Sequence, residues 1–361
     1  MVHLRQIQLS GFKSIRELDL ELGPRNILIG ANGSGKSNFV SLFRLLTEMV
    51  SKKLRLYVSR AGGADALLHF GRKATDRIRC QLHFRDSGYY FTLVPTADDG
   101  LAFASEDWYT LDGHSGELVA DTPPTCPESG LRGHNSAPQP DRETYVLDQM
   151  GSWRVYHFHD TSDSARVKQT CDVHDNQFLR PDASNLAGFL YLLRVRHAGH
   201  YQNIVDAVRM VAPFFDDFDL HPSKLNENKI RLEWKELGSD AHFGPEALSD
   251  GTLRFVCQAT LLLQPEPPPL IVIDEPELGL HPAAITLVSS MLRSAAAKAQ
   301  VIACTQSVTL VNQFEPADVV VVDREEGQSV FRRLTEEQVK GWLDEYALGD
   351  LWEKNIIGGR P

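Results

Sequence analysis

The stretch that most constrains this chain is GANGSGKS, residues 30–37, which directly follows the apolar run NILI. It fits the pattern G-x-x-x-x-G-K-[ST], and the residues after it, SNFVSLFRLLTEMV, carry apolar side chains at helical spacing. A strand, a glycine loop and a helix in this order let backbone N–H groups and a helix N-terminus face phosphate oxygens. The stretch therefore predicts a P-loop that holds a polyphosphate.

Each residue type in this loop has a physical task. Glycines allow the tight turn, Lys36 is expected to reach the β- and γ-phosphates, and Ser37 is expected to ligate Mg²⁺. The residues predicted to contact the nucleotide are Gly30, Asn32, Gly33, Ser34, Gly35, Lys36, Ser37 and Asn38.

An acidic partner for the loop lies in LIVIDEPELGLHP, residues 270–282. Four apolar residues predict a buried strand, so Asp274 emerges at its carboxyl end, where open parallel sheets bind their ligands. We expect Asp274 to hold Mg²⁺, and Glu275 to polarise the water that attacks the γ-phosphate. With a P-loop upstream, this pair predicts ATP hydrolysis, with Lys36 and Glu275 as catalytic residues.

Strand and helix patterns alternate along much of the chain, which predicts an α/β fold with a parallel or mixed sheet flanked by helices. The expected strands lie at residues 4–9, 15–22, 26–30, 77–84, 89–94, 270–274, 300–304 and 317–323, and the expected helices at 37–50, 249–264 and 282–297. The length of 361 residues suits one large domain with an inserted lobe, or two domains.

Within a single domain spanning residues 1–361, we expect three parts after the P-loop. Residues 51–170 are predicted to be an inserted β-rich and loop segment, and residues 171–245 a helical lobe, helical over 183–220. Residues 246–361 are predicted to complete the domain. Five prolines and two glycines in residues 121–142 predict a mobile insertion or linker.

Composition narrows the class of partner. The net charge is −11, which disfavours tight sequence-independent binding to nucleic acid, yet residues 51–80 hold eight basic and two acidic side chains. That segment is either a solvated charged face or a nucleic-acid patch. The longest apolar runs have strand length, no secretion signal is evident, and the five cysteines form no C-x-x-C pair. We therefore expect a cytoplasmic protein with no membrane contact, structural zinc or disulfide.

A second anion site is predicted at LSDGTLRF, residues 248–255, because a helix that begins at SDG presents free N–H groups and a serine hydroxyl. The segment and the acidic strand after it resemble the LSGGQ signature and Walker B segment of ABC-type ATPases. This resemblance implies that Ser249 and Gly251 contact ATP held by a second copy of the chain. The alternative is an ordinary helix capped by Ser249 or Asp250.

The resemblance can be narrowed to one group. LSGFKSI before NILIGANGSGKSN is similar to the opening of SMC, RecF and OLD-family ATPases, and VIACTQS with YALGDLWEKNIIGGRP resembles the compact AAA-labelled ATPases of bacteria in that group. It implies an ABC-type ATPase head that binds ATP and Mg²⁺, forms a homodimer around two nucleotides, and acts in DNA maintenance or anti-phage defence.

Three positions depart from the common ABC pattern. Gln306 stands where a switch histidine is usual and cannot become cationic, so we expect a catalytic role with slow hydrolysis. His281 stands where the D-loop usually has aspartate, and is either a contact across the dimer or a surface residue at a helix start. Asp250 brings a carboxylate near the γ-phosphate, so its side chain should point away.

Weaker candidates remain open. His157 and His159 lie on one face of a predicted strand beside Asp160, a spacing that a metal could use, although packed or surface histidines are the commoner case. Gln81 or another glutamine is a candidate for the Mg²⁺-sensing Q-loop. Lys13 could reach nucleotide or DNA, or lie in solvent.

Three functions fit these residues. The first is an ATP-driven switch that works with a separately encoded effector, because no acidic cluster resembling a nuclease follows the last predicted strand. The second is a RecF-like DNA-binding repair ATPase without an effector. The third is a non-catalytic nucleotide-sensing scaffold, which Gln306 favours and which Lys36, Asp274 and Glu275 oppose.

Overall fold

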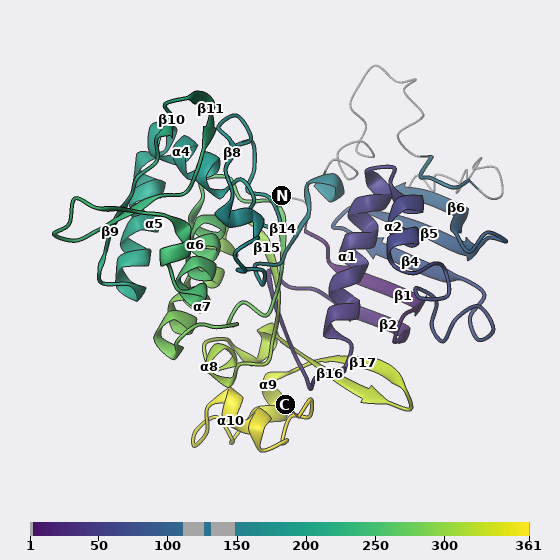
Figure 1. The fold of residues 1–361 in the computed structure, drawn as a ribbon. Helices are drawn as coiled ribbons and strands as arrows, with labels where there is room; N and C mark the ends of the chain where they lie inside the picture. The colour runs from purple at the N-terminus through teal and green to yellow at the C-terminus, as the bar shows by residue number, and fades with distance from the viewer. Residues whose placement is uncertain (1–2, 111–125, 131–148, 361) are drawn as a thin grey trace.

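The computed structural model describes residues 3–110, 126–130 and 149–360, so most of the proline-rich stretch predicted at residues 121–142 lies outside the described residues. Two larger sheets organise the molecule, and helix α1 (Lys36–Val50) lies between them (Figure 1). The strands of the antiparallel sheet lie on one side of α1, and the central strands β14 and β15 lie on the other. Beyond the central strands lie the helices of the lobe.

The central sheet has six strands in the order β17-β16-β3-β15-β14-β7. Their bounds are β3 (Arg25–Ile29), β7 (Arg154–Tyr156), β14 (Leu270–Asp274), β15 (Gln300–Thr305), β16 (Val319–Glu325) and β17 (Gln328–Arg333). Strands β16 to β7 are parallel, and β17 runs antiparallel at the edge. The predicted α/β class with a mixed sheet is confirmed.

Both faces of this sheet are buried, which explains its uninterrupted apolar strands. Ile271 and Ile273 of β14 pack into the core formed with the lobe helices, whereas Leu270 and Val272 pack into the core formed with α1. Successive side chains of a strand alternate between faces, so each strand serves two cores.

The second sheet is antiparallel, in the order β2-β1-β4-β5-β6. Its strands are β1 (Gln6–Phe12), β2 (Ile15–Glu21), β4 (Ile78–His83), β5 (Ser87–Pro95) and β6 (Leu101–Thr110), and helix α2 (Leu54–Arg60) follows α1. The predicted hairpin is β4-β5, and β4 pairs with β1. The strands of the segment predicted as an insertion therefore complete the N-terminal sheet.

The lobe contains α4 (Leu186–Arg196) and α5 (Ala198–Val211), which adjoin α6 (Asp250–Leu263) and α7 (Pro282–Ala295). The prediction of helix through residue 220 is wrong after Val211, because Pro213 lacks an N–H group and disfavours helical geometry at Ala212. Short elements make up the rest: η2 (Arg166–Lys168), β8 (Cys171–Asp172), β9 (Phe215–Phe218), β10 (Pro222–Ser223), β11 (Asn226–Ile230), β12 (Trp234–Glu236), β13 (His242–Phe243) and η3 (Pro245–Ala247).

The part of the chain after β15 packs beside the P-loop. It comprises α8 (Val308–Val311), η4 (Pro316–Asp318), α9 (Glu336–Val339) and α10 (Leu348–Glu353). Gly359 N donates to Asp323 Oδ1 at 2.8 Å, and a Cβ on Gly359 would lie 3.5 Å from Gly30 Cα. The segment after α10 thus forms a wall of the loop. Among the described residues, no helix is both long and apolar enough to cross a bilayer.

Candidate nucleotide-binding site

The P-loop lies between β3 and α1, as predicted. Lys36 is buried, and its Nζ donates to Gly30 O at 2.5 Å and Ala31 O at 3.0 Å. Burial lowers the pKa of Lys36, while Cys304, Asp274 and the glutamates beyond it act in the opposite direction. The ammonium group is therefore held in the loop by carbonyl oxygens that a phosphate could replace.

Two glycines of the loop are required by close packing. A Cβ on Gly30 would lie 2.2 Å from Val322 O, and Gly35, at φ 117°, would place one 1.9 Å from Ser329 Oγ. Ser329 Oγ donates to Ser34 O at 2.6 Å and lies 2.6 Å from Ser14 Oγ, which accepts from Asn38 Nδ2. The GFKSI stretch and the start of β17 thus fix the loop from outside.

The donor set fits a nucleotide with Mg²⁺. Ser34 Oγ is buried and, within the described part of the chain, has no hydrogen-bond partner. Ser37 and Asn32 are exposed at the loop, and Asp274 ends β14 at the same sheet edge. Strand β15 separates β3 from β14, which puts the P-loop and Asp274 about 10 Å apart along the sheet, a span that a phosphate-bound cation can bridge.

The two acidic residues at the end of β14 differ in environment. Burial raises the pKa of Asp274, and the neighbouring Glu275 carboxylate adds to that rise. A divalent cation would offset both effects by pairing with the ionised carboxylate. Glu275 adopts φ 48°, and its N–H donates to Cys304 O at 2.8 Å. Its left-handed backbone turns its side chain away from the line of β14, consistent with a task different from that of Asp274.

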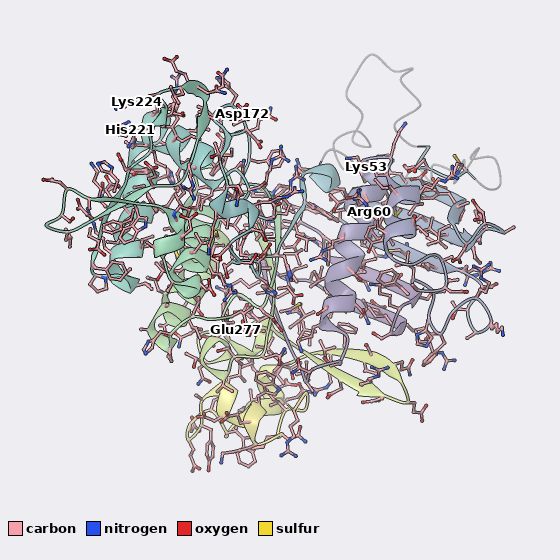
Figure 2. The ribbon with its side chains drawn as sticks, in the orientation of Figure 1. Lys53, Arg60, Asp172, His221, Lys224 and Glu277 are labelled. Atoms are coloured by element: carbon pink, nitrogen blue, oxygen red, sulfur yellow. The ribbon has the colours of Figure 1, made fainter. Side chains whose placement is uncertain are left out.

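Gln306 joins the predicted base to a third carboxylate that the sequence analysis did not identify. Gln306 Nε2 donates to Glu275 Oε1 at 2.8 Å, and its backbone N–H donates to Glu277 Oε1 at 2.7 Å. Glu277 lies near the centre of the molecule (Figure 2), and burial raises its pKa. Its Oε2 has no partner among the described residues. The sequence feature that could have indicated Glu277 is its place two residues after Glu275, as a second glutamate.

The signature segment (residues 248–255) begins α6 and presents an exposed serine. Ser249 caps the helix, accepting from Thr252 N at 3.1 Å, and Asp250 is exposed in the first turn. Within the described residues, no hydrogen bond joins Ser249 or Gly251 to the P-loop of the same chain. The capped helix that the sequence left as an alternative is thus present, and its capping serine is exposed.

The D-loop (residues 276–281) packs directly on this segment. A Cβ on Gly251 would lie 2.3 Å from Gly279 O, so the two backbones are in contact. His281 is exposed and caps α7, with its Nδ1 accepting from Ala283 N at 3.4 Å. His281 is therefore a capping residue at the start of a helix, and its exposed ring is accessible to another molecule.

The loop after β7 adjoins Asp274, because β7 is the parallel neighbour of β14. His159 Nε2 donates to Asp274 O at 3.0 Å, and the ring of His157 packs against that of His159 in a tilted arrangement with centroids 3.8 Å apart. Partial burial lowers the pKa of His157 to about 4, helped by His159 and Arg44. No group of three metal-ligating side chains occurs in the described ranges. Gln81, in contrast, lies in β4 of the other sheet.

A cavity of about 660 Å³ adjoins the P-loop. Its lining includes Lys13, Ser14, Asn38, Phe70 and Arg324. Phe70 is 65% exposed at φ 55°, and Arg324 Nη1 donates to Gly33 O at 3.2 Å. Burial and the nearby Arg44 lower the pKa of Lys13. The cavity combines an exposed aromatic ring with cations and reaches the phosphate loop.

Comparisons with known proteins agree with this geometry. A family model described as "AAA domain, putative AbiEii toxin, Type IV TA system" matches residues 137–312. A second, described as "Protein of unknown function (DUF2813)", matches residues 2–65. No curated protein matches the chain.

Three solved structures share the fold at low identity. The SMC head bound to the C-winged helix domain of ScpA is 14% identical, with a TM-score of 0.59 over 93% of this chain and 99% of that one. The Smc head domain of Pyrococcus furiosus, which has an extended coiled coil and is bound to the C-terminal domain of ScpA, is 15% identical, with a TM-score of 0.59 over 96% and 99%. The Smc head domain with coiled coil and joint from Pyrococcus yayanosii is 13% identical, with a TM-score of 0.56 over the same shares.

The fold is that of an SMC head, an ABC-type P-loop ATPase domain. The family model over residues 137–312 and the P-loop motif are in keeping with an SMC/RecF/OLD-like ABC-type ATPase.

Proposed function

We propose that the chain is an ATP- and Mg²⁺-dependent switch that closes as a homodimer around two nucleotides and reopens after slow hydrolysis. The observation that carries this proposal is the convergence of Lys36, Asp274, Glu275 and Gln306 on one sheet edge, while Ser249 at the start of α6 is exposed and has no hydrogen bond to that P-loop among the described residues. In the proposed dimer, one copy supplies the P-loop contacts to the γ-phosphate and the second copy supplies the signature contacts.

The residues that one copy contributes to its own nucleotide have different roles. Lys36 and the P-loop amides would hold the β- and γ-phosphates, and Ser37 and Asp274 would hold Mg²⁺, which would supply charge neutralisation on the phosphates. Glu275 accepts the proton of the attacking water. Gln306, already bonded to Glu275 Oε1, orients that carboxylate and remains neutral, which suits slow turnover.

The trans half is the signature and D-loop surface. Ser249 and Gly251 contact the γ-phosphate of the partner's ATP, and the D-loop, which ends at the exposed His281, packs against Gly251. Contacts made only in the closed dimer give ATP the differential affinity for the closed state that a population shift requires.

The mass of the Glu275→Gln variant in solution tests the dimer. ATP and Mg²⁺ should double its mass, whereas the Glu275→Gln/Lys36→Ala variant should stay monomeric. A mass that does not respond to ATP contradicts the sandwich. Phosphate release faster in wild type than in Glu275→Gln excludes the non-catalytic scaffold.

The switch is proposed to serve DNA maintenance or anti-phage defence in the cytoplasm, with a separately encoded effector protein. Support comes from the fold, because two of the similar SMC heads were solved in complex with ScpA domains. Co-purification of this chain with the product of an adjacent gene, dependent on ATP and Lys36, is the expected result. Equal recovery with Lys36→Ala contradicts nucleotide control of that partner.

A second function, RecF-like DNA binding, is favoured by a groove of about 570 Å³ between α1, α2 and β7. Lys13, Arg44, Arg60 and Arg154 line it, against one carboxylate, Glu48. Figure 2 shows Lys53, which directly precedes α2, and Arg60, which ends it, at the same side of the molecule.

Two other cations of the basic stretch, Arg72 and Arg77, are paired with carboxylates. Arg72 pairs with Asp65 at 3.0 Å and with Asp99, and Arg77 pairs with Asp76. Charge reversal at Arg44 and Arg60 should therefore weaken DNA binding and flatten its log–log salt slope by about 0.9 per lost phosphate contact. The matched control, reversal at Arg72 and Arg77, should change the slope little, and equal effects of both pairs would refute the groove.

A further inference from the structure

Arg254 links three loops at the nucleotide-facing edge. It lies on α6, three residues after Gly251, and its Nη2 donates to His159 O at 2.9 Å and to Thr161 Oγ1 at 3.1 Å. Its Nε donates to Phe158 O at 3.3 Å. A Cβ on Gly279 would lie 2.5 Å from Arg254 Nη1, so the guanidinium also packs on the D-loop backbone.

His159 carries the connection to the candidate base. Its backbone carbonyl accepts from Arg254, and its ring Nε2 donates to Asp274 O. The Asp274 carbonyl belongs to the peptide that precedes Glu275. A displacement of α6 along its axis therefore reaches the Glu275 backbone through His159.

A second link from the same helix reaches the same loop. Gln258, one turn after Arg254 on α6, donates from Nε2 to Pro276 O at 2.7 Å. Glu275 thus lies between two attachments, at Asp274 and Pro276, that both originate on α6. Its own N–H is fixed to Cys304 on the other side. Motion of α6 relative to β15 must then change the geometry of Glu275.

We propose that Arg254 is a positioning residue that makes hydrolysis in one copy depend on the nucleotide held by the other. The inference rests on the proposed sandwich dimer, in which the N-terminus of α6 touches the partner's γ-phosphate. Contact there moves α6, and Arg254 carries the movement through His159 to Glu275. Three donors in a rigid plane suit this task, and a lysine with one flexible ammonium group cannot reproduce it.

The Hill coefficient of steady-state hydrolysis against ATP concentration tests the coupling. Wild type should give a value near 2, the number of sites, and Arg254→Lys a value near 1. A fall in kcat of about tenfold should accompany it, the usual effect of losing a hydrogen bond to a charged group. His159→Gln, which keeps an N–H donor, should preserve cooperativity, and His159→Ala should abolish it.

Controls separate coupling from loss of fold. Arg293→Lys, at an exposed arginine of α7, should change neither quantity, and the melting temperature of Arg254→Lys should stay within a few degrees of wild type. If Glu275→Gln/Arg254→Lys still doubles its mass with ATP while the Hill coefficient of Arg254→Lys equals that of wild type, the coupling is refuted and the dimer stands. If Glu275→Gln itself does not respond to ATP, the dimer and the coupling both fall.

Discussion

Replacing Phe70 by alanine should weaken binding of ATP without weakening binding of the triphosphate chain alone. The ring is 65% exposed, lines the cavity beside the P-loop and packs against the ring of His69, with centroids 4.4 Å apart. Its φ of 55° is unfavourable for a bulky side chain, and strain of this kind concentrates where a protein clamps a ligand. We therefore expect the ring to stack on the nucleobase.

The magnitude follows from the exposed part of the Phe70 ring. Stacking of a base on an aromatic side chain contributes about 1–3 kcal/mol, so the Kd for ATP should rise by about 5- to 150-fold. Removing an exposed side chain changes the free energy of unfolding by about 0.5 kcal/mol or less. Alanine leaves the left-handed backbone under similar strain, so the loss of ATP affinity can be separated from a change in the free energy of unfolding.

The assay is equilibrium binding of ATP and of tripolyphosphate, each with Mg²⁺, to wild type and variant. Phe214→Ala is the matched control, because that ring is 47% exposed in the lobe after α5. Only the affinity of Phe70→Ala for ATP should fall. An equal loss for ATP and tripolyphosphate, or no loss for either, would refute base stacking at Phe70.

Three further predictions concern stability. Burial raises the pKa of Glu277, so its ionisation lowers the stability of the folded state as pH rises. Glu277→Gln should therefore raise the free energy of unfolding by about 1 kcal/mol at pH 8, measured by denaturant titration, and this gain should shrink towards pH 5. His157, with a pKa lowered to about 4, contributes stability above pH 6.5 that is lost as pH falls; His157→Gln should flatten the loss between pH 6.5 and 4 in urea titrations, and an unchanged slope would contradict this. Gly251→Ala forces a methyl against Gly279 O and should lower the free energy of unfolding by about 1–3 kcal/mol, whereas Gly199→Ala, with open space around it, should not.

Local patterns were enough to predict the P-loop, β14 and the capped start of α6. Each of these is defined within a dozen residues, by glycine spacing, an apolar strand or a serine before a helix. The same is true of the hairpin β4-β5. The interactions that form these elements act between residues close in sequence, so a single sequence is enough to recognise them.

Other parts of the site depend on which strands lie side by side, and the sequence does not display that. His159 matters because β7, a strand of three residues, is the parallel neighbour of β14. Gln81, a candidate for the sensing position, belongs to a strand paired with β1 and lies in the other sheet. Glu277 gains its interest from burial beside Gln306, a contact between residues 29 apart.

The order in which the chain leaves the ribosome bears on the central sheet. Strand β3 leads into the P-loop, yet its two neighbours are β15 and β16, and Asn26 bonds to Val301 across 275 residues. During synthesis β3 therefore has both edges open until β15 and β16 have emerged, and long-range pairing of this kind is slow to form. A nascent chain should remain unable to bind ATP, and open to chaperones at those edges, until β15 and β16 close around β3.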